Sequence, residues 1–189
     1  MRPYTPGVRF ALPRGNERLE LLAILGRPPA ESAPRLLGQL LVRRRGRGAL
    51  AVRIVETEAY LGADDPAAHA FRGRTPRTEP LFGPPGTLYV YLIYGMHHCL
   101  NLAVQERGLP GCVLIRAAEP VGDVRLETLR GPGRLCRALG IDTRLSGLSL
   151  FDGKTGLTLR RGEPPAKVLV SPRIGIRRAV ERELRFRSI

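Results

Sequence analysis

The segment Val55–Asn101 constrains the fold of this chain most. Runs rich in Val, Ile, Leu and Tyr predict β-strands at 49–60, 87–93 and 97–104. The last two runs flank Tyr94-Gly95-Met96, which predicts a β-hairpin with these three residues at its tip. A carboxylate, a histidine, an amide and several tyrosines interrupt the apolar runs. Because such side chains can hold a flat heterocycle and activate a water molecule, the segment predicts a binding site built on a sheet.

The rest of the chain predicts a single α/β domain over residues 1–189, with its strands concentrated in the middle. A chain of this length buries about 70% of its unfolded surface. Apolar spacing predicts helical segments at Glu17–Leu25, Ser32–Leu37, Val124–Arg130 and Arg134–Leu139. Ser32 is expected to cap the second segment and Gly140 to end the last. Further strands are expected at Leu40–Val42, Cys112–Ala118, Leu157–Leu159 and Val168–Val170, and an extended surface loop at Arg72–Pro85.

The charge of the chain favours a polyanionic partner. It has 31 basic and 17 acidic residues, a formal net charge of +14, and only two of its basic residues are lysines. Self-repulsion of this size opposes folding, whereas arginine matches phosphate oxygens bidentately. A nucleic-acid backbone is therefore the expected counter-charge. The Arg43–Gly48 turn predicts a solvated arginine cluster, with phosphate contact as the alternative.

An anionic membrane surface is the rival partner for this charge. The sequence shows no amphipathic helix with an aromatic face to support it. No apolar run approaches the roughly 18 residues that a membrane span requires. The first residues, Met-Arg-Pro-Tyr-Thr-Pro-Gly, lack an apolar signal core. We therefore expect a cytoplasmic protein that does not associate with membranes.

The cysteines predict buried thiols rather than disulfides or a metal site. Cys99, Cys112 and Cys136 form no Cys-x-x-Cys pair, and their odd number argues against a disulfide framework. The neighbours His97 and His98 cannot both share a strand face with Cys99, which leaves too few ligands for zinc. No metal and no cofactor are expected.

Strand alternation predicts a cluster of charges. One face of the 49–60 strand is expected to carry Leu50, Val52, Ile54, Glu56, Glu58 and Tyr60. After Gly111, one strand face is expected to carry Cys112, Leu114, Arg116 and Ala118. Arg116 is thus a charge in an apolar strand, and it needs an anionic partner because burying it alone is costly. Glu58 or Glu56 is the candidate, either in a structural salt bridge or in a catalytic pair.

One histidine and three tyrosines are further candidates. His69 follows the turn-prone Asp64-Asp65-Pro66, although a lone histidine is usually a surface or structural residue. Tyr89 and Tyr91 share a strand face, and core packing explains Tyr89. Tyr94 falls at the predicted hairpin tip, where an exposed aromatic ring gains nothing from water. A wedge pushed between base pairs would give this ring a use.

Sequence motifs between Arg35 and Phe186 carry a family resemblance. The most specific are Val-Glu-Thr-Glu-Ala-Tyr-Leu-Gly from Val55 and the Tyr-Gly-Met tripeptide from Tyr94. Others are Arg-Gly-Arg-Thr-Pro-Arg, Pro-Gly-Thr-Leu-Tyr-Val-Tyr, Val-Leu-Ile-Arg-Ala-Ala-Glu-Pro, Gly-Pro-Gly-Arg-Leu-Cys and Pro-Arg-Ile-Gly. Together they resemble the alkyladenine (3-methyladenine) DNA glycosylase family. Leu184 departs from the family pattern, in which an aromatic residue stands before the Arg-Phe pair.

The resemblance implies a fold and a catalytic pair. The fold is one α/β (α+β) domain, compact, with a curved and mainly antiparallel sheet, flanking helices and a protruding β-hairpin. Glu58 is implied to be the general base that deprotonates a water molecule aimed at the sugar C1′. Arg116 is implied to help hold this water and the carboxylate.

The resemblance also implies a pocket for a flipped base and a wedge for the duplex. The pocket residues are expected to be Tyr60, His69, Tyr91 and Asn101. Tyr94 is expected to fill the gap left in the duplex, with Met96 beside it. The partner is double-stranded DNA that contains damaged purines, and the protein is expected to be a monomer associated with the nucleoid.

The implied reaction is hydrolysis of the N-glycosidic bond of alkylated or deaminated purines such as 3-methyladenine and hypoxanthine. The nucleotide must first rotate out of the duplex, which costs a few kcal/mol. A damaged base pairs poorly, so it rotates out at a lower cost than a normal base. Strand cleavage would require an amine nucleophile, and the only lysines, Lys154 and Lys167, lie in a region with no pocket motif. We therefore expect a monofunctional enzyme without lyase activity.

Two other functions stay open from the sequence. A related fold could serve as a binding module without chemistry, since fold alone does not fix function. A glycosidase that acts on RNA is the second alternative. The Glu58–Arg116 pair beside tyrosines argues against the module, because backbone binding does not require it. A comparison of DNA and RNA duplexes would separate the two enzymes.

Overall fold

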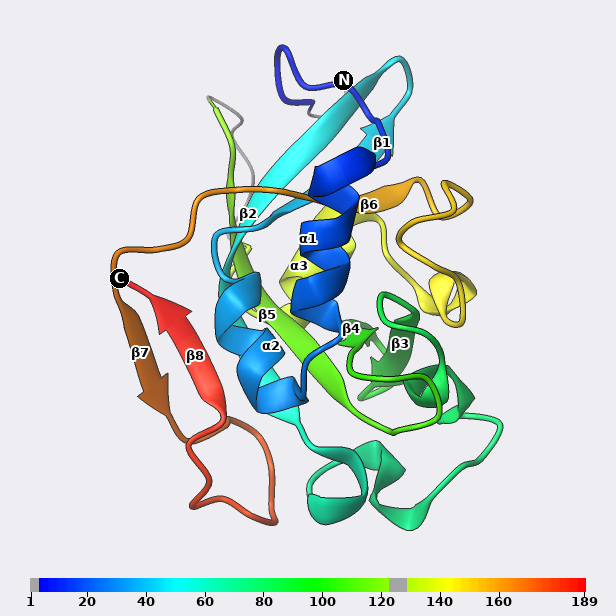
Figure 1. Cartoon of the computed structure of the whole chain (residues 1–189), viewed down its shortest axis with the longest axis vertical. Helices are drawn as coiled ribbons and strands as arrows, with labels where there is room; N and C mark the ends of the chain where they lie inside the picture. Colours follow the sequence, from blue (N-terminus) through cyan, green and yellow to red (C-terminus); the bar gives the residue numbers. More distant parts are fainter. Residues whose placement is uncertain (1–3, 123–128) are drawn as a thin grey trace.

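A long central strand, β2 (Gly48–Tyr60), organises the sheet (Figure 1). Along one edge it pairs with β5 (Cys112–Pro120). Along the other edge, its first half pairs with β1 (Leu40–Arg45) and its second half with β8 (Arg185–Ser188). Every one of these pairings is antiparallel. The end of the chain is thereby placed beside the carboxylates of β2.

The computed structural model describes residues 4–122 and 129–189, and in them the chain forms three α-helices and eight strands. The sheet has the order β3-β4-β5-β2-β1-β6 and curls on itself, with β7 joined through β8. The other strands are β3 (Leu88–Ile93), β4 (His97–Ala103), β6 (Leu157–Arg160) and β7 (Val168–Ser171). This is the α+β domain with a curved antiparallel sheet that the resemblance implies.

The helices cover one face of the sheet and enclose the main core. α1 (Gly15–Leu25) and α2 (Pro29–Leu36) lie in front of the strands in Figure 1, and α3 (Pro132–Leu139) packs against β4 and β5. Gly140 ends α3 in the left-handed conformation, as predicted. Four short 3₁₀ turns complete the fold: η1 (Gly62–Asp64), η2 (His69–Arg72), η3 (Glu79–Phe82) and η4 (Thr143–Leu145).

Strand β2 changes the face that it buries halfway along its length. Register irregularities fall between Ile54 and Glu56 and between Glu56 and Thr57. Leu50, Val52 and Ile54, which precede these irregularities, pack into the main core. After the irregularities, Ala59 packs into it. Thr57 also points to the helical side, because its hydroxyl donates to the Ala33 carbonyl of α2. The prediction of one shared face is therefore wrong: Glu56, Glu58 and Tyr60 lie opposite the apolar residues that precede them.

Strand β5 changes phase at the same level. Val113, Ile115 and Ala118 all contribute to the main core, although simple alternation puts Ala118 with Arg116. Arg116 has no partner in the β2–β5 register. Because irregularities in both strands coincide, the pair bends locally while its overall register is preserved. The bend turns the carboxylates and Arg116 away from the main core.

Ser32 does not cap a helix. α2 begins at Pro29, and proline suits a first helical position because the amide hydrogen that it lacks has no partner there. Ser32 lies inside α2, and its hydroxyl donates to the carbonyls of Ile24 and Arg27, both at 2.8 Å. The serine joins α1 to α2 instead of starting a helix.

The arginines of the β1–β2 hairpin are only partly solvated. β1 extends to Arg45, so the turn is shorter than predicted. Arg43 donates to the Thr155 and Gly140 carbonyls, and Arg45 donates to the Ala138 carbonyl. Carbonyls at the end of a helix lack intrahelical partners, so they attract these donors. The prediction of a solvated cluster is wrong for Arg43 and Arg45.

Three other expectations differ from the structure or lie outside it. Arg72–Pro85 is not simply a surface loop, because η3 lies within it and buries Leu81. β8 was not predicted. The helix expected at Val124–Arg130 falls largely on residues 123–128, outside the described residues. Among the described helices, none is long and apolar enough to cross a membrane.

The C-terminal strand should contribute strongly to stability. Phe186 in β8 is 7% exposed and packs into the main core, so Phe186→Ala should lower the free energy of unfolding by about 3–5 kcal/mol. Urea unfolding measures this, with the exposed neighbour Arg187→Ala as the control. A loss no larger than that of the control would show that β8 is not part of the core.

Candidate active site

A cavity of about 490 Å³ opens on the sheet face opposite the main core. Strands β2, β3, β4 and β5, the 62–72 region and the segment after β7 all contribute to its wall. The lining includes every residue that was predicted for the base pocket: Tyr60, His69, Tyr91 and Asn101. It also includes Arg116 and Tyr94. The structure thus brings together residues that lie far apart in the sequence.

Three aromatic rings form one connected wall of the cavity. The His69 Nδ1 atom lies 2.8 Å from the Tyr89 hydroxyl, which fixes the orientation of the imidazole. The His69 and Tyr91 rings meet edge to face, with centroids 4.6 Å apart. The centroids of the Tyr89 and Tyr91 rings are 5.5 Å apart. Tyr89 is a core residue, as predicted, and it also supports His69.

The ionisable groups of this wall are neutral near pH 7. Burial, aided by the nearby Arg77 charge, lowers the pKa of His69. Burial raises the pKa of the Tyr60 and Tyr91 hydroxyls well above their usual range. A neutral aromatic wall does not repel a cationic base and can stack on it.

The Asn101 amide is held in one orientation. Its Nδ2 donates to the backbone carbonyls of Tyr89 and Cys99, at 3.2 and 3.4 Å. Its Oδ1 lies 3.7 Å from the Cys112 thiol, which donates to it. Burial raises the pKa of Cys112 to about 12. All three cysteines are free and buried, as predicted.

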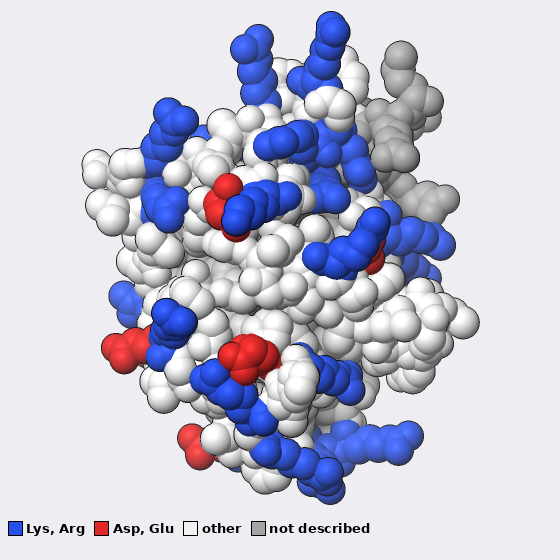
Figure 2. All heavy atoms as spheres, turned by 90° about the vertical axis from the view of Figure 1, so that its right-hand side faces the viewer, with Lys and Arg blue, Asp and Glu red and all other residues white. Residues whose placement is uncertain are grey.

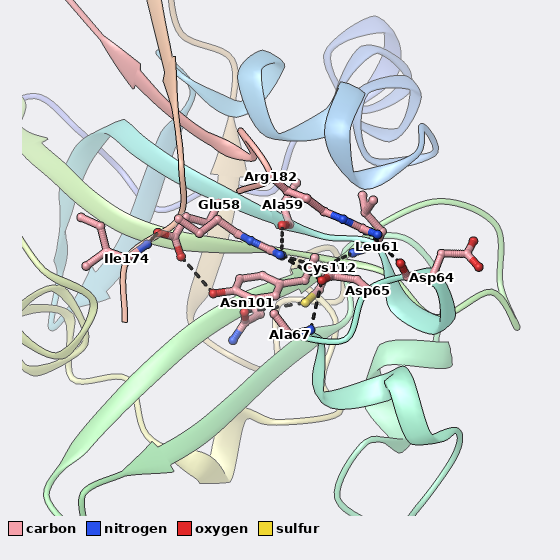
Figure 3. Close-up of polar contacts among 12 residues, drawn as sticks. Glu58, Ala59, Leu61, Asp64, Asp65, Ala67, Asn101, Cys112, Ile174 and Arg182 are labelled. Carbon is pink, nitrogen blue, oxygen red and sulfur yellow. Dashed lines mark hydrogen bonds and ion pairs between the residues drawn. The ribbon is translucent and has the colours of Figure 1, made fainter. Parts of the chain in front are cut away.

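Glu58 is completely buried beside the cavity rather than on its wall. Its side chain is 0% exposed, and it contacts three lining residues. The Ile174 amide, which lies beside Glu58 in Figure 3, donates to Oε1 at 2.8 Å. The Tyr60 hydroxyl donates to Oε2 at 3.0 Å. Arg116 lies 3.4 Å from Oε1. The carboxylate therefore has a donor on each oxygen and a positive charge close by.

Arg116 pairs with both of its candidate partners. Its Nε lies 2.9 Å from Glu56, closer than its contact with Glu58. Glu56 also accepts from Arg185 of β8 at 2.7 Å. Two arginines and two glutamates thus form one small network in which Glu58 is the most deeply buried member.

The environment separates the pKa values of the two glutamates. Burial raises the pKa of Glu58, and the opposing effects of Arg116, the Ile174 amide and the Tyr60 hydroxyl do not cancel it. Burial also disfavours ionisation of Glu56, but its bonds to Arg185 and Arg116 outweigh this and lower its pKa. Paired carboxylates with divergent pKa values are typical of sites where one carboxylate handles a proton.

The β3–β4 hairpin carries its apolar tip into solvent. Tyr94 is 80% exposed and Met96 is 70% exposed. Tyr94 has a φ of 54°, and Gly95 has a φ of 68°. Few residues other than glycine adopt this conformation, so the turn holds Tyr94 outward at some conformational cost. The structure places both predicted wedge residues on this tip.

Basic side chains contribute to the wall of the cavity. Arg77, Arg177 and Arg178 belong to its lining. Figure 2 shows one side of the molecule, on which basic side chains far outnumber acidic ones. A polyanion is therefore attracted to this protein as a whole and to the cavity in particular.

Several residues of the site were not predicted. Ile174 donates its amide to Glu58, Asp65 and Arg173 form an ion pair next to Ile174 in sequence, and Arg185 joins the network of Glu58 through Glu56. The motif Pro172-Arg173-Ile174-Gly175 did mark the segment, but nothing in its pattern indicated a role. Among residues 4–122 and 129–189, no group of three or more His, Cys, Asp or Glu side chains is arranged to hold a metal ion.

Comparison with known proteins identifies the family. The family model described as methylpurine-DNA glycosylase (MPG) matches residues 23–188. The chain belongs to this family. It is 44% identical over 171 residues to a protein of Methanocella arvoryzae, covering 84% of this chain and 85% of that protein. It is 49% identical over 153 residues to a protein of Myxococcus xanthus, covering 79% and 78%. Both relatives bear the name "Putative 3-methyladenine DNA glycosylase".

Membership of the methylpurine-DNA glycosylase family makes the chain a DNA glycosylase, a hydrolase that acts in DNA repair. The match extends over the whole cavity, from the carboxylates of β2 to the segment after β7. It therefore supports an enzyme over a binding module without chemistry.

The opposite pKa shifts of the two glutamates predict opposite effects on stability. The folded state holds the pKa of Glu58 above its unfolded value, so ionisation costs stability as the pH rises through the folded pKa. Glu58→Gln should therefore raise the melting temperature at neutral pH, and the gain should shrink at about pH 4. The pKa of Glu56 is lowered in the folded state, so its ionised form stabilises the fold at pH values above its unfolded pKa. Glu56→Gln should therefore lower the melting temperature at neutral pH. Equal shifts of one sign in both variants would contradict this assignment.

Proposed function

We propose that the protein flips alkylated or deaminated purines, such as 3-methyladenine or hypoxanthine, out of duplex DNA and hydrolyses their N-glycosidic bond. The observation that carries this proposal is the placement of Glu58: a fully buried carboxylate, with a donor on each oxygen, next to an aromatic cavity. A damaged base pairs poorly, so it rotates out of the duplex at a lower cost than a normal base.

The cavity suits a flat, electron-poor purine. Its volume of about 490 Å³ lies in the range of ligand pockets. Tyr60, His69 and Tyr91 offer neutral aromatic rings for stacking, and Asn101 offers a fixed amide. An alkylated purine, cationic in the case of 3-methyladenine, gains from the negative faces of tyrosine rings.

In the proposed reaction, a water molecule attacks the sugar C1′ and Glu58 takes its proton. The oxygen of the water forms a bond to C1′ while the bond from C1′ to the base nitrogen breaks, and the base leaves with the electron pair. The two donors on Glu58 occupy only part of its lone pairs, so the carboxylate can still accept a proton. Its charge also stabilises the positive character that develops at C1′. Arg116 favours the ionised form of Glu58.

The reaction ends at an abasic site without strand cleavage. A lyase needs an amine nucleophile in the pocket, and neither Lys154 nor Lys167 lines the cavity. No cofactor takes part in the proposed chemistry. Because its substrate is DNA, we propose that the protein works at the nucleoid in the cytoplasm, and that it does so as a monomer.

Glu58→Gln should bind lesion DNA nearly as well as the parent protein but lose turnover. Glutamine keeps the shape of the side chain yet cannot take a proton from water, so single-turnover base release should fall by roughly 100-fold or more. Glu56→Gln is the matched control, because it removes the other carboxylate that contacts Arg116. A larger loss in Glu56→Gln than in Glu58→Gln would transfer the role of base to Glu56.

Tyr94→Ala should impair activity on duplex DNA more than activity on single strands. Without the ring, the flipped state loses its plug, which disfavours flipping by about 1–3 kcal/mol. Tyr4→Ala is the control, since Tyr4 is also an exposed tyrosine but does not line the cavity. Equal losses on duplex and single-stranded substrates would make Tyr94 a structural residue.

A further inference from the structure

The segment after β7 crosses the active site with a single buried anchor. Ile174 to Arg178 line the cavity, and in residues 172–178 only Arg173 is buried. Within the described chain, no backbone–backbone hydrogen bond holds these seven residues. Ile174 itself is 48% exposed, so packing of its side chain does not fix its position. Apart from the bond between the Ile174 amide and Glu58, the placement of the segment therefore depends on the contacts of Arg173.

Arg173 forms a completely buried ion pair with Asp65. Both side chains are 0% exposed. The guanidinium donates to both carboxylate oxygens of Asp65, and it also donates to the Ala59 carbonyl at 2.9 Å. Its centre lies 4.6 Å from the centroid of the Tyr60 ring. One side chain thus holds the 59–65 region to the segment after β7.

Asp65 is held by backbone amides of its own turn. Its carboxylate accepts from the Leu61 amide at 3.2 Å and from the Ala67 amide at 3.1 Å (Figure 3). These bonds fix the turn between β2 and His69. Asp65 is therefore fixed within the 61–67 turn, and its ion pair with Arg173 joins this turn to the segment after β7.

The two donors to Glu58 are direct neighbours of this ion pair. Ile174, which follows Arg173, donates its amide to Oε1, and Tyr60, which lies under the guanidinium, donates its hydroxyl to Oε2. A well-packed apolar pair would be about as stable as a buried ion pair. An apolar pair would not fix the relative orientation of the two segments, whereas the two parallel hydrogen bonds of a guanidinium to a carboxylate do.

We propose that the Asp65–Arg173 ion pair is a positioning device for Glu58, which holds the Ile174 amide on one carboxylate oxygen and the Tyr60 hydroxyl on the other. This inference rests on the proposed function of Glu58 as the general base. Arg173 and Asp65 are positioning residues, because neither of them touches the reacting atoms.

The inference predicts a change in pH dependence, since loss of a donor raises the pKa of a carboxylate. Five ionisable groups face Glu58: Arg116 from β5, Glu56 and Tyr60 from β2, Cys99 from β4 and Arg173 from the crossing segment. Arg185 acts on it only through Glu56. When the Ile174 amide moves away, Glu58 should ionise at a higher pH, so the acid limb of the rate profile should move to higher pH.

The test is a double variant of the full chain, Asp65→Asn with Arg173→Met. It removes both buried charges together, so no unpaired charge remains to unfold the protein. Single-turnover release of hypoxanthine from a duplex is measured across pH, with melting temperature and lesion binding alongside. We expect release at neutral pH to fall about 10- to 100-fold, a shift of the acid limb to higher pH, and nearly unchanged binding.

Arg182→Gln is the matched control. Arg182 also ties this part of the chain to the same turn, through an exposed bond to the Asp64 carbonyl. Its rate and pH profile should match those of the parent protein. If the double variant does not fold, Arg173→Lys replaces it, because lysine keeps the charge but cannot form the fork; the same shift of the acid limb is then required.

A folded variant with the parental pH profile would overturn the inference, even if its melting temperature fell. Glu58→Gln separates this failure from failure of the proposed function. If Glu58→Gln stays active, the role of Glu58 as base is wrong. If Glu58→Gln is inactive while the ion-pair variant keeps the parental profile, only the positioning role is wrong.

Discussion

The burial of the Glu58 carboxylate is the constraint on which the rest of this site depends. A charge at 0% exposure is costly unless donors and an opposite charge accompany it. The protein supplies them from three directions: Tyr60 on the same strand, Arg116 on the neighbouring strand, and the Ile174 amide on a distant segment. These contacts do not cancel the effect of burial, and the pKa of Glu58 stays raised. A carboxylate in this condition accepts a proton more readily than an exposed one.

The fold serves this requirement by closing the C-terminal part of the chain onto β2. β8 pairs with the second half of β2 and delivers Arg185 to Glu56, while Phe186 enters the main core. Leu184, which departs from the family pattern, still fits here: its carbonyl accepts from the Ala59 amide at 2.8 Å, and its side chain packs on the core. The coinciding irregularities of β2 and β5 then turn the carboxylates toward the cavity. Stability and site geometry are therefore built from the same strand pairings.

The sequence predicted those features of the fold and the site that depend on the pattern of residues within a single strand or hairpin. Strand periodicity predicted the β3–β4 hairpin and the partnership of Arg116 with Glu58 or Glu56, and the resemblance indicated the pocket residues. Alternation failed where two strands bend together, because a bulge has no signature in either strand alone. It also could not reveal Asp65–Arg173, whose partners are 108 positions apart, or the bonds from Arg43 and Arg45 to the end of α3. Such contacts depend on tertiary structure, which periodicity does not encode.

The most direct test of the account is base release in water labelled with oxygen-18. A duplex with a single hypoxanthine is treated with excess protein in one turnover, and the free base, the abasic strand and any cleaved strand are quantified. The account predicts free hypoxanthine, an intact strand, and the label at C1′ of the abasic sugar when the product is trapped at once by reduction. The same label should be nearly absent with Glu58→Gln. Strand cleavage, or release at the parental rate without Glu58, would contradict hydrolysis by a carboxylate-activated water.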